Sequence, residues 1–493
     1  MTDAHPLTLF NSLTRRNEAF QPVHPGVPGD AAQPPQARVY TCGPTVYNYP
    51  HIGNMRAYVF ADVLGRTLSF KGYKLTHVIN ITDVGHLTDD ADAGEDKLEK
   101  AAKDRAQSIW DIARHYTEAY WADIAALNIR QPAQWSIATD YVPQMIEFAR
   151  SIADRHCYEL SSGLYFDVST VADYGLLARS ATEEGEGRID PVDGKRHAAD
   201  FAIWRRTPAG EKRQMEWDSP WGRGAPGWHL ECSVMSGALL GFPFDIHTGG
   251  IDHREIHHPN EIAQNQAFCC AGGLDLPANS GARVWMHNNF LVERSGKMSK
   301  SSGEFLRLQL LIDRGFHPLA YRLMCLQAHY RSELEFSWEG LAATLTRLKR
   351  LLMTVSGLRA QAGPAVAAGA WFGPFRDRFD SAMSDDLNTP VALTVLEEVA
   401  ALKKTDPSEK LAALAAMDAV LGLNLLGLDR AELRLRPAKA VIGDQEIDAA
   451  LAARDAARAA KDFAASDALR AELAGRGVEV MDGDPLRWDW RLD

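Results

Sequence analysis

The stretch from Phe244 to Gln264, FDIHTGGIDHREIHHPNEIAQ, constrains the fold more than any other part of the chain. An apolar run leads into His247-Thr248-Gly249-Gly250, a pattern typical of a strand that ends in a glycine turn where backbone can approach a ligand. Pro259 has no N–H to donate and fits the first turn of a helix. His257 and Glu261 then lie one turn apart on that helix. Such a pair can form half of a zinc site, although it is also an ordinary hydrogen bond at a helix start.

Length, charge and cysteine usage limit the classes of protein that this chain can belong to. Its 493 residues predict two to four globular domains. No run of about 18 apolar residues and no secretory signal are present, so we expect a cytoplasmic protein without a membrane segment. Six scattered cysteines do not resemble a disulfide framework and leave thiolates available to a metal. The net charge of −12 excludes indiscriminate binding to polyanions, so a nucleic acid would have to bind local basic surface.

The order of the predicted elements indicates an α/β fold with a Rossmann-like parallel sheet that carries an insertion, followed by helical domains. A strand at 38–41, a helix at 52–70 and a strand at 75–81 form a βαβ unit. Near the C-terminus we expect one long Ala-rich helix at 446–475 and a small β element after it. The predicted division of the chain is a lead-in at 1–37, a sheet domain at 38–110 and 225–304, an inserted subdomain at 111–224, a helical region at 305–360, a helical bundle at 375–427 and a C-terminal element at 446–493.

Two short motifs at opposite ends of the sheet domain suggest phosphate chemistry. PHIGN at 50–54 opens a helix directly after a strand, where backbone N–H groups can hold an anion. KMSKS at 297–301 places Lys297 and Lys300 three apart in a glycine-flanked loop, and such lysines can neutralise charge that develops on phosphates. Either motif alone is common in proteins of other functions. Together in one parallel-sheet domain they are far more specific.

These motifs resemble the signatures of class I aminoacyl-tRNA synthetases, and the remaining motifs resemble those of cysteinyl-tRNA synthetases. His51 to Asn54 matches His-Ile-Gly-His except that Asn54 replaces the second histidine, and Lys297 to Ser301 matches Lys-Met-Ser-Lys-Ser throughout. Cys42 just before the first motif, PGWHLEC ending at Cys232, and the HHPNE box carry the cysteine-specific resemblance. It implies one zinc ion held by Cys42, Cys232, His257 and Glu261.

The same resemblance implies the reaction and further site residues. The expected enzyme is a ligase that activates L-cysteine with Mg-ATP to cysteinyl-adenylate, releases pyrophosphate, and then transfers cysteine to tRNA(Cys). A monomer is expected. Catalysis and ATP binding are assigned to His51, Gly53, Asn54, Lys297 and Lys300. The cysteine pocket is assigned to Cys42, Thr82, Trp228 and Asp252. By resemblance, residues 305–360 contact the tRNA stem, 375–427 form an anticodon-binding bundle, and the C-terminal element reads the anticodon through Arg458, Asp467 and Asp482.

Several alternatives stay open from the sequence. His253 and His258 could replace His257 as the imidazole ligand, because DHREI stands where many members of the family have an apolar run that ends in proline. The adjacent Cys269 and Cys270 are interpreted as small core residues rather than ligands. A related ligase would pass activated cysteine to an amino sugar, and a non-catalytic zinc-dependent RNA-binding module is a third possibility. Zinc chemistry agrees with an enzyme that selects cysteine, because a metal that prefers thiolate can distinguish cysteine from the nearly isosteric serine. The amino-sugar ligases lack the C-terminal part that this chain has, and the intact KMSKS and PHIGN motifs argue against the non-catalytic module.

Overall fold

Five parallel strands form the central sheet of the protein, which we describe from a computed structural model. The structure describes residues 4–27, 29–84, 108–178, 194–269, 273–293, 296–297 and 306–492. The strand order is β11-β10-β3-β4-β5. The strands are β3 (Gln36–Thr41), β4 (Lys74–Ile81), β5 (Gln134–Ile137), β10 (Phe244–Gly250) and β11 (Ala282–Asn288). Strand β3 lies between β4, which follows it in the chain, and β10, which comes later and pairs with its other edge. The carboxyl ends of β3 and β10 are therefore a topological switch point, where ligands bind in such folds.

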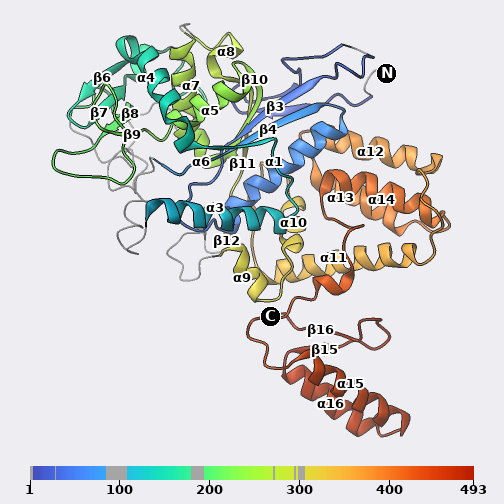
Figure 1. Cartoon of the computed structure of the whole chain (residues 1–493). Helices are drawn as coiled ribbons and strands as arrows, with labels where there is room; N and C mark the ends of the chain where they lie inside the picture. Colours follow the sequence, from blue (N-terminus) through green and yellow to red (C-terminus); the bar gives the residue numbers. More distant parts are fainter. Residues whose placement is uncertain are drawn as a thin grey trace.

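Helices cover both faces of this sheet (Figure 1). They are α1 (Ile52–Phe70) on one face, and α5 (Leu230–Leu240) and α7 (His257–Phe268) on the other. Side chains alternate along β3, so Thr41 points toward the α1 side, where its hydroxyl lies 2.8 Å from Nε2 of His77. Tyr40 and Cys42 point to the opposite face. Cys42 at the end of β3 is thereby directed toward α5 and α7.

The insertion begins later in the chain than the sequence predicted. Strand β5 lies within the predicted insertion at 111–224, yet it pairs with β4 and forms the edge of the central sheet. Its four residues carry too little alternation to be recognised as part of that sheet. Helices α3 (Ile109–Ala126) and α4 (Val142–His156) flank it. The inserted sheet itself is antiparallel, with the strands β6 (Cys157–Leu160), β7 (Gly163–Phe166), β8 (Phe201–Arg206) and β9 (Gly224–Pro226).

The N-terminal residues also differ from the expected extended lead-in at 1–37. They include a hairpin of β1 (Thr8–Asn11) and β2 (Arg16–Ala19). The backbone N–H of Ser12 donates to the carbonyl of Trp285 in β11. The hairpin therefore packs against the edge of the sheet, a tertiary contact that a proline-rich and glycine-rich composition does not predict.

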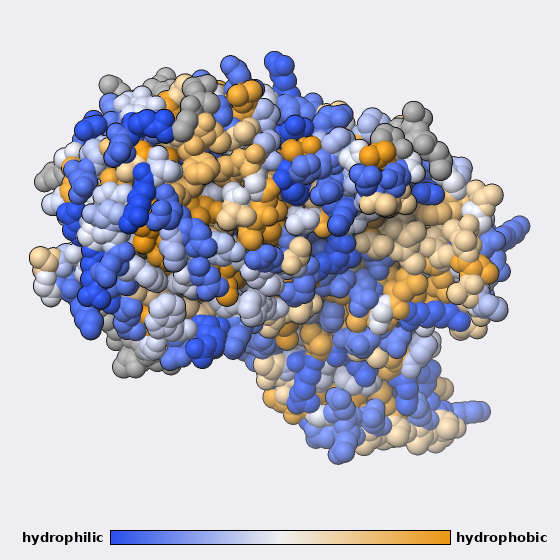
Figure 2. Space-filling view, turned by 45° about the horizontal axis from the view of Figure 1, so that its top comes forward, coloured by the Kyte–Doolittle hydropathy of each residue, from blue (hydrophilic) through white to orange (hydrophobic). Residues whose placement is uncertain are grey.

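Helices follow the sheet, as predicted (Figure 1). They are α9 (Leu308–Asp313), α10 (Pro318–Leu326), α11 (Trp338–Arg359), α12 (Gly373–Ser384), α13 (Thr389–Ala401) and α14 (Pro407–Leu421). Their buried apolar residues belong to the same core as those of the sheet. None of the described helices is long and apolar enough to cross a membrane. On the face shown in Figure 2, hydrophilic residues predominate, and hydrophobic residues form patches among them.

The C-terminal element has a core of its own and projects from the rest of the molecule (Figure 1). It contains α15 (Asp444–Ala459), α16 (Phe463–Gly475), β15 (Val478–Val480) and β16 (Trp488–Trp490). The predicted small β element is thus present, but the predicted single helix is wrong. Lys461 adopts a φ of 62°, and the side chain of Asp462 caps α16 by accepting from Ala465 N. These two residues divide the Ala-rich stretch into a helical hairpin.

Candidate active site and metal centre

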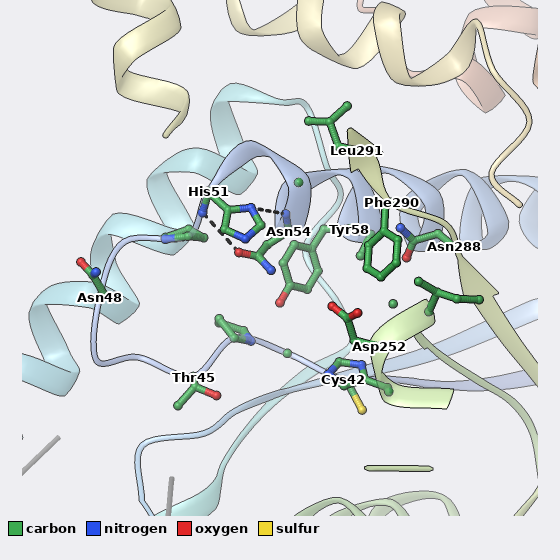
Figure 3. Close-up of a pocket in the computed structure, with 18 of the residues that line it drawn as sticks. Cys42, Thr45, Asn48, His51, Asn54, Tyr58, Asp252, Asn288, Phe290 and Leu291 are labelled. Carbon is green, nitrogen blue, oxygen red and sulfur yellow. Dashed lines mark hydrogen bonds between the residues drawn. The ribbon is translucent and has the colours of Figure 1, made fainter. Parts of the chain in front are cut away.

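A cavity of about 290 Å³ opens at the switch point between β3 and β10 (Figure 3). Its lining comes from three places: the segment from Cys42 to Tyr58, the turn from Gly250 to His253, and the segment from Asn288 to Leu291. Trp228 completes the wall. The cavity therefore joins the start of α1 to the glycine turn and the end of β11.

The PHIGN turn caps α1 at the mouth of this cavity (Figure 3). Nδ1 of His51 accepts from Asn54 N at 3.2 Å, and His51 N donates to Oδ1 of Asn54, also at 3.2 Å. Asn54 thus uses its oxygen in a reciprocal cap. Its amide nitrogen has no partner among the described residues. A Cβ at position 53 would lie 2.9 Å from the ring of His51, so a larger residue than Gly53 would displace that ring.

Four buried side chains form a cluster next to the cavity, which Cys42 also lines: Cys42, Cys232, His257 and Glu261. One ligand atom from each lies within 4.8 Å of all the others. The two sulfurs are 4.0 Å apart, and Nε2 of His257 is 3.0 Å from Oε1 of Glu261. Two Zn–S bonds of about 2.3 Å at a tetrahedral angle would hold sulfurs about 3.8 Å apart. The donor set and its spacing therefore fit a four-coordinate zinc ion.

The electrostatics of these four residues favour the ligand forms of two of them. Interaction with the Cys42 thiol, assisted by His257, lowers the pKa of Cys232 to about 6 against the effect of burial. Burial opposes the charge on Glu261, but His247 and His257 outweigh it and lower the pKa of Glu261 to about 2. Burial is also the main reason why the pKa of Cys42 is raised. One thiolate and one carboxylate are thus favoured before any metal binds.

A second layer of imidazoles surrounds the four residues. Three of the four have an imidazole within hydrogen-bond distance: His258 Nε2 lies 3.2 Å from Cys42 Sγ, His229 Nδ1 lies 2.9 Å from His257 Nδ1, and His247 Nε2 lies 2.9 Å from Glu261 Oε2. Such partners fix the orientation of metal ligands and their protonation.

The two alternative imidazoles occupy different positions. His258 belongs to a second possible ligand set with Cys42, His247 and Glu261. His253 belongs to neither set but lines the cavity. Burial lowers the pKa of His253 to about 3, so its ring is neutral at pH 7. Gly249 lies between the two rings, and a Cβ there would approach each of them to 2.7 Å.

Of the four residues assigned to the cysteine pocket, three line the cavity and one does not. Cys42, Trp228 and Asp252 line the cavity. The ring of Trp228 lies 4.6 Å from that of His257. Thr82 is buried just after β4, where its hydroxyl accepts from Asn80, and it is absent from the described lining of the cavity. Its contact with a substrate stays a prediction.

The KMSKS motif falls largely outside the described residues. Lys297 lies in β13 (Gly296–Lys297), which pairs antiparallel with β12 (Leu291–Glu293) beside the cavity. Lys300 and the side chain of Lys297 lie outside the part of the chain that the structure describes. Cys270 lies outside it as well.

The C-terminal element brings two of its three predicted residues into direct contact. Nη1 of Arg458 in α15 donates to Oδ1 of Asp482 at 2.9 Å, and Arg454 and Arg470 also donate to this carboxylate. Asp467 is exposed on the neighbouring helix α16. Lys461, which a continuous helix would align with Arg458, lies in the turn between the helices instead.

Sequence analysis did not identify several residues of the site. These are Tyr58 and the Asn288–Leu291 wall, which line the cavity, and His229 and His247, which contact His257 and Glu261. His229 and His247 stand beside motif residues, but no spacing in the sequence shows that their rings point at the ligand set. That information exists only in the packing of α5 and β10 against α7.

Three family models match this chain. The model described as tRNA synthetases class I (C) catalytic domain covers residues 30–346, the DALR domain covers 378–428, and the cysteinyl-tRNA ligase anticodon binding domain covers 443–491. Among solved structures, methionyl-tRNA synthetase of Mycobacterium tuberculosis is similar with a TM-score of 0.51 at 14% identity, covering 79% of this chain and 90% of that one. The fold is therefore that of a class I synthetase.

Curated relatives specify the family further. The cysteine–tRNA ligase of Novosphingobium aromaticivorans is 77% identical over 489 residues, which cover 99% of this chain and 97% of that protein. The cysteine–tRNA ligase of Zymomonas mobilis is 53% identical, with coverage of 99% and 98%. With full-length identity at this level and the catalytic model over most of the chain, the protein belongs to the cysteinyl-tRNA synthetase family.

Proposed function

We propose that this protein activates L-cysteine with Mg-ATP and transfers it to the 3′-terminal adenosine of tRNA(Cys). The observation that carries the proposal is the cluster of two thiols, an imidazole and a carboxylate, of which Cys42 lines the cavity that the PHIGN turn also lines. In the first step a carboxylate oxygen of cysteine bonds to the α-phosphorus, and the bond to the β-phosphate oxygen breaks to release pyrophosphate. In the second, a ribose hydroxyl of the tRNA attacks the carbonyl carbon and AMP leaves.

Zinc is the cofactor that the donor set supports, with Cys42, Cys232, His257 and Glu261 as its ligands. This set has two sulfurs, whereas the set with His247 and His258 has one, and thiolate is the donor that favours zinc. Cys42 also lines the cavity, which gives a substrate access to the site. When bound, zinc would supply a Lewis acid that accepts a thiolate far better than the hydroxyl of serine.

The walls of the cavity can hold the rest of the amino acid. Asp252 supplies a carboxylate suited to the ammonium group of cysteine, and Trp228 limits the space beside His257. Thr82 is the least supported member of this group, because it is buried behind the described lining. A small pocket closed by an aromatic ring would exclude larger side chains by volume.

Nucleotide binding is proposed for His51, Gly53 and Asn54 with Lys297 and Lys300. The cap at the start of α1 leaves the amide nitrogen of Asn54 available to a phosphate oxygen, a role that the histidine of the family motif has at this position. The two lysines would stabilise the charge of the phosphates and their Mg²⁺ as pyrophosphate leaves. Positioning and charge stabilisation provide most of the rate acceleration in such a reaction.

Reading of the tRNA anticodon is proposed for Arg458, Asp467 and Asp482. A guanidinium can pair with a guanine edge, and carboxylates can accept from the amino groups of unstacked bases. The pairing of Arg458 with Asp482 in the free protein holds both groups in place before a base arrives. A monomeric state and a cytoplasmic location stay predictions from the sequence.

Pyrophosphate exchange with a panel of amino acids tests the proposal. We expect exchange that depends on cysteine, does not require tRNA, and is negligible with serine. Absence of exchange with cysteine would contradict the proposed enzymatic activity and would favour the non-catalytic RNA-binding module. Exchange without charging of tRNA(Cys) would instead favour the ligase that acts on an amino sugar.

A further inference from the structure

Arg56 lies in the second turn of α1, two residues after the PHIGN motif in the chain, and is 2% exposed. Its guanidinium donates to four backbone carbonyls. Nη1 donates to Asn289, at 2.9 Å, and to Phe290; Nη2 donates to His329, at 3.3 Å, and to Ser332, at 2.6 Å. One side chain thereby joins three segments that are far apart in the sequence.

Two of these carbonyls belong to the wall of the cavity. Asn289 and Phe290 line it together with Leu291, and Leu291 begins β12, the strand that pairs with β13 and Lys297. On the other side of the cavity stand His51 and Asn54 at the start of α1. Arg56 therefore links, through one rigid helical turn, the two parts of the cavity between which the nucleotide is proposed to bind.

The bonding of Arg56 is unusual for a buried cation. No carboxylate among the described residues forms an ion pair with it, although buried arginines are normally paired. Arg322 gives a comparison in the same core: it is also fully buried, and it bonds to Asp62 as well as to carbonyls. A guanidinium whose hydrogen bonds go to carbonyls holds backbone in a fixed geometry, and Glu333 acts on Arg56 only through its charge.

We propose that Arg56 is a positioning residue for adenylate formation, which fixes the wall from Asn289 to Leu291 at a set distance from the PHIGN turn. The wall approaches that turn closely, since a Cβ on Gly53 would lie 3.7 Å from Cβ of Leu291. Small displacements of reacting groups reduce rates strongly, on the order of 10²-fold for about 1 Å. This inference rests on the proposed function, because it assigns the cavity to the nucleotide.

Arg56→Lys tests it, because lysine keeps the charge but cannot reach four carbonyls with a planar fork. We expect kcat for cysteine-dependent pyrophosphate exchange to fall about 10²-fold, with little change in zinc content or in KM for cysteine. Arg322→Lys is the matched control, since it removes a comparable buried fork whose acceptors, Asp62, Leu127 and Leu421, are absent from the described lining of the cavity. It should lower the melting temperature by a similar amount and keep kcat near that of the unaltered protein.

Leu291→Ala examines the same wall with the buried guanidinium left in place, and it should lower kcat in the same direction. Unchanged kcat in either Arg56→Lys or Leu291→Ala would overturn the inference, as would an equal loss of kcat in Arg322→Lys. Absence of cysteine-dependent exchange in the unaltered protein would be a failure of the proposed function, and it would be seen before any variant is compared.

Discussion

Sγ of Cys42 and Sγ of Cys232 lie 4.0 Å apart, although 190 residues separate them in the chain. Cys42 follows β3 and Cys232 lies in the first turn of α5, so their approach depends on how α5 packs on the sheet. Both cysteines are free, and a separation of 4.0 Å is about twice the length of a disulfide bond. The two thiols are therefore not bonded to each other, and their spacing is compatible with a common metal.

Replacing Cys232 with serine should remove most of the zinc from the purified protein. A hydroxyl is a hard and weakly acidic donor, so it replaces a thiolate poorly. Metal analysis of Cys232→Ser checks this, with Cys269→Ser as the control. Cys269 donates to the carbonyl of Ala278 and belongs to neither possible ligand set. A normal zinc content in Cys232→Ser would remove Cys232 from the ligand assignment.

Gly249→Ala should weaken zinc binding without removing a ligand. The new methyl group would approach the rings of His253 and His258 to 2.7 Å, and His258 is the imidazole that contacts Cys42. Loss of such an outer partner typically lowers metal affinity by about 10- to 100-fold, which competition with a chelator can measure. Gly250→Ala is a close control, because its Cβ would meet nothing within 4 Å. Equal affinity in the two variants would contradict this role for the ring of His258.

His77 should make the stability of the protein depend on pH. Burial is the main reason why its pKa is lowered from 6.5 to about 4. As the pH falls below 6.5, the unfolded chain binds a proton that the folded protein does not, so stability decreases between pH 6.5 and 4, by at most about 3 kcal/mol. Urea unfolding at pH 7.5 and 5 should therefore show that the free energy of unfolding decreases less for His77→Gln than for the unaltered protein. An equal decrease in the two proteins would mean that His77 does not contribute to the pH dependence of stability.

The sequence predicted the parts of the site that follow local rules. His257 and Glu261 lie one turn apart on α7, as the position of Pro259 indicated, and the start of α1 is capped within the PHIGN motif. The meeting of Cys42 with Cys232 came only from resemblance, because no local pattern relates a strand end to a distant helix. The same limit explains why Arg56 was missed, since its four acceptors are backbone atoms without a sequence signature.

The fold shows a similar division between local and tertiary information. The βαβ unit at the start of the sheet and the later helices were recognisable from periodicity. Strand β5 was assigned to the insertion, because four residues are too few to show alternation and only pairing with β4 defines their place. The helix break at Lys461 was missed because Ala-rich sequence favours a continuous helix, whereas the packing of α15 against α16 requires a turn with positive φ.

Lys300→Ala should slow adenylate formation far more than it weakens the binding of cysteine. Its charge is needed chiefly when the phosphates redistribute charge, so its loss should act on the transition state. Pyrophosphate exchange should show a large decrease in kcat and little change in KM for cysteine. A variant with normal kcat and a raised KM would contradict the role given to the KMSKS loop.

Deleting residues 440–493 should abolish charging of tRNA(Cys) and leave cysteine-dependent pyrophosphate exchange largely intact. The deleted element has a core of its own, and its contacts with the rest of the chain include the ion pairs Lys349–Asp489 and Arg430–Asp484. Leu433 belongs to the main core, so the cut has to follow it.

A point variant separates loss of base reading from loss of the whole element. Arg458→Ala removes one guanidinium from the cluster around Asp482, while Arg454 and Arg470 still bond to that carboxylate and hold the fold of the element. One bidentate contact to a base is worth about 1–3 kcal/mol, so kcat/KM for tRNA should fall by roughly 5- to 150-fold, with exchange unchanged. Normal charging by both the deletion and Arg458→Ala would show that this element does not read the anticodon.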